Sequence, residues 1–111
     1  MKVLFHINEP DFWPRVIINV SNFLRDVGPG RASVEVVANG AGVIAYSLDK
    51  QDLIKQMEEL HGQGVVFIAC RNALKMHGIN EQTLPFFVTV VPAGITEIVE
   101  KQALGYAYIK P

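Results

Sequence analysis

Short apolar runs alternate with amphipathic segments along almost the whole chain, and this alternation limits the possible folds more than any other feature. The apolar runs, expected to be strands, lie at 2–7, 33–38, 65–69, 87–91 and 106–109. The amphipathic segments, expected to be helices, lie at 11–27, 49–61, 71–77 and between Gly94 and Gly105. Strands that alternate with helices across short turns form right-handed βαβ units. The pattern therefore predicts an α/β fold, a three-layer sandwich around a five-stranded, mostly parallel sheet.

The expected helix boundaries rest on capping and helix-breaking residues. Asp11 can cap the first helix, Pro14 is tolerated in its first turn, and the glycines and proline at 28–30 end it. The stretches 40–48 and 78–86 carry neither the strand pattern nor the helix pattern. We expect both to be loops near a site or an interface.

Composition narrows the class of protein. The 111 residues carry ten basic and eleven acidic side chains, a net charge of -1, without a dense cluster of Lys or Arg, which argues against nucleic acid and membrane surfaces as partners. No apolar run is long enough to cross a bilayer, and the first residues lack a signal-peptide cleavage site. We therefore expect a single cytoplasmic domain over residues 1–111. Half of the residues are hydrophobic and 19% are charged, which favours a buried subunit interface and hence a homo-oligomer.

The chain has one cysteine, Cys70, at the end of an expected strand and directly before an expected helix. A thiolate there is favoured by the N–H groups at the helix start and by a nearby cation such as Arg71. The alternative is that Cys70 is a small core residue that merely ends an apolar strand. Both interpretations fit the sequence.

Other polar residues can be placed near Cys70 through the expected topology. In open parallel sheets, ligands bind outside the carboxyl ends of the strands, where the strand order reverses. If the order is flavodoxin-like, the first and third strands are neighbours, so His6, Asn8 and Glu9 converge with Cys70 and Asn72. His6 is then a candidate for proton transfer, or else a hydrogen-bonded structural histidine.

The segment Asn39-Gly40-Ala41-Gly42 follows the second expected strand and offers backbone N–H groups to an anion, although a sharp turn also explains its glycines. The GxGxxG and P-loop patterns are absent, as are CxxC, HxxxH and GxSxG. We therefore expect no cofactor and no metal site.

Several segments carry a family resemblance: VVFIACRNAL at 65–74 followed by Gly78-Ile79, VANG at 37–40, VPAGI at 91–95, and GYAYI at 105–109. Together they resemble the DsrE/DsrF-like family, small proteins associated with intracellular sulfur oxidation and sulfur relay. The resemblance implies the same sandwich fold and oligomers that are often trimers or hexamers, with a dimer also open. It further implies a cysteine that carries a persulfide, which by position is Cys70.

The preferred hypothesis is a sulfurtransferase-like carrier in which the Cys70 thiolate accepts sulfane sulfur from a donor protein and releases it to an acceptor thiol. His6 would assist proton movement. The expected substrate-binding residues are Asn72, Arg71, Asn8, Asn39 and Gly40. One alternative is a non-catalytic oligomeric module whose pocket takes a small anion or a nucleotide. Another is a structural or regulatory subunit, which a buried Cys70 without an adjacent cavity would favour.

Overall fold

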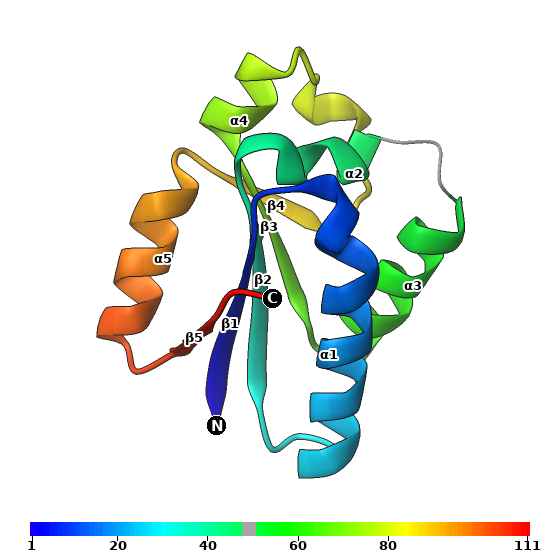
Figure 1. The fold of residues 1–111 in the computed structure, drawn as a ribbon, viewed down its shortest axis with the longest axis vertical. Helices are drawn as coiled ribbons and strands as arrows, with labels where there is room; N and C mark the ends of the chain where they lie inside the picture. Colours follow the sequence, from blue (N-terminus) through cyan, green and yellow to red (C-terminus); the bar gives the residue numbers. More distant parts are fainter. Residues whose placement is uncertain (48–50) are drawn as a thin grey trace.

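The computed structural model describes residues 1–47 and 51–111, and within them five parallel strands form one sheet (Figure 1). The strands are β1 (Lys2–Ile7), β2 (Ser33–Ala38), β3 (Val66–Cys70), β4 (Val88–Val91) and β5 (Ala107–Ile109), in the order β4-β3-β2-β1-β5. The predicted α/β fold with a five-stranded parallel sheet is confirmed.

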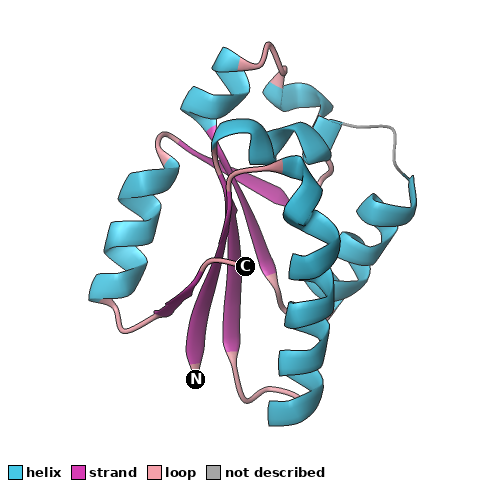
Figure 2. Ribbon diagram, in the orientation of Figure 1, coloured by secondary structure: helices cyan, strands magenta, loops and turns pink. Residues whose placement is uncertain are grey.

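Helices cover both faces of the sheet (Figure 2). On one face lie α1 (Trp13–Val27) and α3 (Gln51–Gly62), with the short α2 (Ile44–Ser47) and α4 (Arg71–Met76) near the carboxyl ends of the strands. On the other face lies α5 (Gly94–Ala103). Short 3-10 turns occupy Pro10–Phe12, Gly40–Val43 and Glu81–Thr83. The result is the three-layer arrangement that the alternation of segments predicts.

Two apolar layers hold the helices to the sheet. The larger one lies under α1 and α3, where helical spacing brings Trp13, Val16 and Val20 onto the buried face of α1. The smaller one lies under α5 and consists of Leu4, Val37, Ile68 and Ile98. Because the middle strands are buried on both faces, their sequences are near-continuous apolar runs rather than alternating ones.

The strand order differs from the flavodoxin-like arrangement, because β2 lies between β1 and β3. The connections through α1, α3 and α4 each step one strand in the same direction, and the connection through α5 then crosses the other face to place β5 beside β1. Local periodicity does not encode this order, since each strand is apolar enough to pair with any other.

The stretch expected to be a loop at 40–48 is largely helical where it is described. Val43, Ala45 and Tyr46 are buried there, and the Tyr46 hydroxyl donates to the carbonyl of Ile68 at 3.0 Å. Tertiary packing supports turns that are too short to be stable alone. The expected helix start at Asp49 lies outside the described residues, and α1 begins at Trp13, after the 3-10 turn, rather than at Asp11.

None of the helices in the described ranges combines the length and the apolar character needed to span a membrane.

Candidate functional site

A pocket of about 250 Å³ opens at the carboxyl edge of the sheet, between the starts of α4 and α5. The chain leaves β3 toward the face that carries α1 and α3, and leaves β4 toward the opposite face, which carries α5. This divergence of adjacent strands makes the edge between β3 and β4 a topological switch point. The pocket is lined by Asn39, Gly40, Cys70, Asn72, Ala73, Met76, Ala93, Gly94 and Ile95.

Cys70 forms part of the pocket wall. It is the last residue of β3 and the N-cap residue of α4, with extended backbone angles (φ -76°, ψ 119°). Its exposed fraction is 6%, so most of the side chain is packed while part of it borders the opening. The residue also belongs to the larger apolar cluster, so the thiol is largely shielded from bulk solvent.

Gly94, the first residue of α5, allows that helix to approach Cys70 closely. A Cβ atom on Gly94 would lie 3.3 Å from the Cβ of Cys70 and 3.1 Å from the Cβ of Asn39. Any side chain at this position would therefore push α5 away or fill the space next to the thiol. The start of α5 and the ends of β2 and β3 meet here because this glycine has no side chain.

Three side chains beside the pocket form a hydrogen-bonded chain. His6 at the end of β1 is 8% exposed; its Nδ1 lies 2.6 Å from the Tyr108 hydroxyl and its Nε2 lies 2.8 Å from Oδ1 of Asn39. An amide oxygen only accepts hydrogen bonds, so Nε2 carries the proton and donates to Asn39. In the tautomer with its one ring proton on Nε2, Nδ1 is the acceptor for the Tyr108 hydroxyl. Burial raises the pKa of Tyr108, which keeps this hydroxyl protonated.

The remaining predicted site residues are more widely distributed. Asn72 lines the pocket from α4. Arg71 forms a two-point ion pair with Glu81, and this hydrogen bonding holds the pKa of Glu81 below its ordinary value. This ion pair compensates the positive charge of Arg71. Asn8 accepts a hydrogen bond from Lys110 at 3.2 Å.

The sequence matches a known protein family over almost its whole length. A sequence model described as the DsrE/DsrF-like family matches residues 2–111. The chain belongs to this family. Membership connects it with sulfur relay in general. No curated protein matches the sequence.

Two solved structures share the DsrE/DsrF-like fold of this chain. MTH1491 from Methanobacterium thermoautotrophicum, a protein of unknown function, is 37% identical with a TM-score of 0.89, over 99% of this chain and 98% of that one. BT1422 from Bacteroides thetaiotaomicron, also of unknown function, is 14% identical with a TM-score of 0.72, over 99% and 94% of the two chains. At this low identity, the similarity to BT1422 shows only that the two proteins share a fold.

In this DsrE/DsrF-like chain, His6 and Cys70 are on the same edge of the sheet, but not through neighbouring strands. Because β2 separates β1 from β3, Asn39 at the end of β2 stands between them and hydrogen bonds to His6. Glu9 is exposed and is not among the pocket residues. The expectation that β1 and β3 are adjacent is therefore wrong. His6 and Cys70 are instead linked through Asn39 at the end of β2.

Tyr108 and Gly94 are the residues of this site that the sequence reasoning missed. The sequence places Gly94 only before a helix and Tyr108 only in the last strand. Both lie within the segments VPAGI and GYAYI that carry the family resemblance. The resemblance of these segments could therefore have indicated the two residues, although it assigns no chemical role to either. The strand register explains the placement of Tyr108, which pairs with Leu4 and so lies on the same sheet face as His6.

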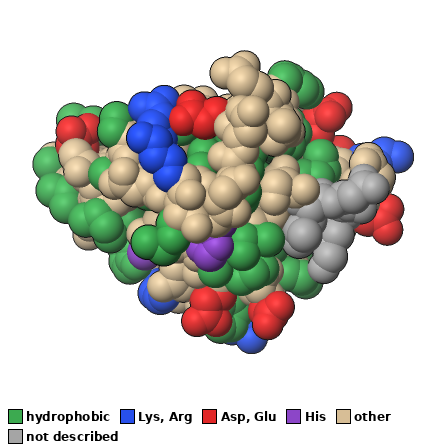
Figure 3. All heavy atoms as spheres, turned by 90° about the horizontal axis from the view of Figure 1, so that it is seen from above, with side chains coloured by type: hydrophobic (Ala, Val, Ile, Leu, Met, Phe, Trp, Pro, Cys, Tyr) green, Lys and Arg blue, Asp and Glu red, His purple; other side chains and the backbone are tan. Residues whose placement is uncertain are grey.

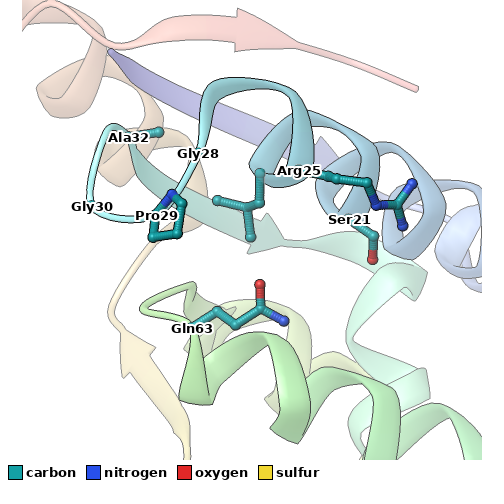
Figure 4. A pocket seen from close by; sticks show the side chains of 8 residues that line it. Ser21, Arg25, Gly28, Pro29, Gly30, Ala32 and Gln63 are labelled. Atoms are coloured by element: carbon teal, nitrogen blue, oxygen red, sulfur yellow. The ribbon is translucent and has the colours of Figure 1, made fainter.

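A second, larger pocket of about 590 Å³ lies at the opposite edge of the sheet, between the C-terminal ends of α1 and α3 (Figure 4). Its polar side chains are Ser21, Arg25 and Gln63, and the turn at 28–30 forms another part of its wall. None of the residues predicted for the site lies there. Among the described residues there is also no cluster of three His, Cys, Asp or Glu side chains suited to a metal ion.

Proposed function

We propose that this protein is a sulfur carrier in which Cys70 accepts a sulfane sulfur atom, holds it as a persulfide and passes it to an acceptor thiol. The observation that carries the proposal is the position of the chain's one cysteine in the wall of a pocket at the β3–β4 switch point. Ligands of open parallel sheets bind at such an edge. The general connection of the family with sulfur relay supports the same chemistry.

The proposed transfer needs no external oxidant. The Cys70 thiolate attacks the terminal sulfur of a donor persulfide, R–S–SH, and a new S–S bond forms as the donor S–S bond breaks. The electron pair leaves with the donor thiolate, and the transferred sulfur keeps its proton as Cys70–S–SH. In the second step an acceptor thiolate attacks this terminal sulfur, and Cys70 leaves as a thiolate.

The pocket also discriminates between the proposed functions. Its volume of about 250 Å³ is smaller than the roughly 300–1,000 Å³ of pockets that enclose drug-sized ligands, which disfavours a nucleotide at Cys70. A buried Cys70 with no adjacent cavity would favour a purely structural subunit, whereas here the residue borders a pocket. A compact sulfur group fits this volume better than either alternative.

Proposed roles follow the placement of each side chain. Asn72 and Asn39 reach the pocket and can donate hydrogen bonds to sulfur. Both ring nitrogens of His6 are engaged, so His6 acts on the pocket through Asn39 rather than by direct proton transfer. Gly40 forms part of the pocket wall. Arg71 is paired with Glu81 and is not among the residues that line the pocket, so we assign it no role in the transfer step.

The proposal is tested by intact-protein mass spectrometry after incubation with glutathione persulfide. Wild-type protein is expected to gain one sulfur atom, which dithiothreitol then removes, and the Cys70→Ser variant is expected to gain none. The serine variant is a matched control because it differs from cysteine only in the reacting atom. An unchanged mass of the wild type, or equal gains in both proteins, would contradict the sulfur-carrier function.

We also propose that the protein forms a homo-oligomer through the face that carries α5. Hydrophobic side chains gather at the left end of the molecule in Figure 3, over α5. Ile95 and Val99, four residues apart on this helix, are each 60% exposed. On the same side of the sheet, Val66 and Tyr108 are also exposed. We propose that a second copy of this chain covers this face. The family resemblance implies oligomers, and the high share of hydrophobic residues favours a buried interface between subunits.

A further inference from the structure

The hydrogen-bonded chain beside the pocket has a defined direction. In the tautomer with the ring proton on Nε2, which the Asn39 oxygen selects, the Tyr108 hydroxyl donates to Nδ1 of His6 and Nε2–H donates to Oδ1 of Asn39. The Asn39 carboxamide thus has its oxygen turned toward His6. Its nitrogen, on the opposite branch of the planar group, is left with both N–H donors for other partners.

Asn39 also lines the pocket that contains Cys70. The Cβ atoms of Asn39 and Cys70 both lie within 3.3 Å of the point where Gly94 would carry a Cβ, so the two side chains start from adjacent positions in the wall. The described side chains that line this pocket carry no formal charge. Negative charge that develops on sulfur there therefore depends on neutral donors such as the Asn39 amide.

We propose that Tyr108 is a positioning residue that acts through His6 to hold the Asn39 carboxamide with its Nδ2 hydrogens facing the pocket, where they stabilise the perthiolate of Cys70. This inference rests on the proposed function, because it assigns the groups that hold the anionic sulfur. It also defines the substrate class: a single sulfur anion, supplied and received by thiols, rather than an ion of higher charge that would require a cationic side chain in the pocket.

The burial of His6 makes the arrangement specific. At 8% exposed, the imidazole has little access to water to replace a lost partner, so each nitrogen depends on the partner it has. Removing the Tyr108 hydroxyl leaves Nδ1 without its donor and frees the ring and the amide to adopt other hydrogen-bond patterns. Tyr106 offers a matched control, because it lies two residues away and its ring contacts Lys2 and Lys101 instead.

The experiment follows the reaction of the persulfide with iodoacetamide, a neutral reagent, as a function of pH. Protein loaded with one sulfur is alkylated and the product is quantified by intact mass, in wild type, Tyr108→Phe, Asn39→Leu, the double variant and Tyr106→Phe. In Tyr108→Phe and Asn39→Leu, the perthiolate loses a hydrogen bond, so the midpoint of the curve of alkylation rate against pH is expected to rise by about one pH unit. At pH values below the midpoint, the rate should fall about tenfold. The double variant should equal Asn39→Leu, because the two residues act in series.

A second readout requires no sulfur at all. The ¹⁵N spectrum of the imidazole in the unmodified protein is expected to show Nε2 protonated and Nδ1 unprotonated, and Tyr108→Phe should change the Nδ1 resonance while Tyr106→Phe does not. A wild-type His6 protonated at Nδ1 instead would overturn the positioning role. The positioning role would also be overturned if the pH midpoint of persulfide alkylation were the same in wild type, Tyr108→Phe and Asn39→Leu. The carrier function would still stand in that case. Failure of the wild type to load sulfur would reject the carrier function itself.

Discussion

At the scale of single residues, Gly42 decides how closely the segment after β2 can approach the end of β1. A Cβ atom there would lie 2.5 Å from the carbonyl oxygen of Ile7 and 3.0 Å from its carbonyl carbon. Both are backbone atoms of a buried strand and cannot move aside easily. The Gly42 carbonyl also accepts a hydrogen bond from the indole of Trp13 at 2.8 Å. This close approach places Asn39 next to His6.

We predict that Gly42→Ala lowers the free energy of unfolding by about 1–3 kcal/mol, the usual cost of overpacking, as measured by urea denaturation. Gly62→Ala is the control, because nothing lies within 4 Å of the position of its Cβ. Its stability should change little or rise slightly, since alanine favours a helix more than glycine does. Equal effects of the two substitutions would mean that the contact with Ile7 does not limit the packing.

At the scale of elements, α5 is held to the sheet partly by a cluster of ionisable side chains around the buried Glu35. Glu35 of β2 is 4% exposed; its Oε2 lies 3.6 Å from Nζ of Lys101, which is also 3.9 Å from Oε2 of Glu97. Within the described residues, Oε1 of Glu35 has no hydrogen-bond partner. The pKa of Glu35 is raised to about 8, mainly because burial disfavours its charged form; the neighbouring Glu97 carboxyl adds to the rise and Lys101 opposes it.

This raised pKa predicts that stability falls as the pH rises. Between the ordinary pKa of 4.5 and about 8, the folded protein holds a proton on Glu35 that the unfolded chain has released. The free energy of unfolding from this group therefore decreases across that window, by at most about 1.4 kcal/mol per pH unit, and levels off above it. Denaturation at several pH values should show a weaker decrease in Glu35→Gln.

Glu100→Gln is the matched control for this pH dependence, because Glu100 is an exposed carboxylate on the same helix. It should retain the wild-type profile. A pH profile that is the same in wild type and Glu35→Gln would show that the buried carboxyl keeps an ordinary pKa.

At the scale of the whole molecule, the two outer layers differ in how much of the sheet they cover. Residues of α1, α3 and α4 pack over one face, whereas α5 alone lies on the other and contacts mainly β2 and β3. Strand residues beside α5, such as Val66 and Tyr108, consequently remain exposed. This asymmetry is the physical basis for proposing that α5 faces a second copy.

We predict that wild-type protein is oligomeric by size-exclusion chromatography with light scattering, and that Val99→Glu shifts it toward the monomer because a charge would be buried in the interface. Ile18→Glu is the control, since Ile18 is 59% exposed on α1, in the opposite layer. A monomeric wild type, or dissociation by Ile18→Glu alone, would place the interface elsewhere or remove it.

The sequence was sufficient for those features that depend on neighbouring residues. β2 spans 33–38 as expected, and the expected strand end at Cys70 and helix stop at Gly28 agree with the structure. Helical spacing, apolar runs and chain-breaking glycines act within a few residues, so their effects can be read locally. The α/β class and the position of Cys70 at a strand end followed from these signals.

Only the tertiary structure decided which strands are neighbours and which side chains meet. His6 is 33 residues from Asn39 and 102 residues from Tyr108, yet both contact its ring. Pairings over such separations are selected by the total packing of the sheet and its helices, and no periodicity within one segment encodes them. The thiol could therefore be located from the sequence, whereas its hydrogen-bonded surroundings required the folded molecule.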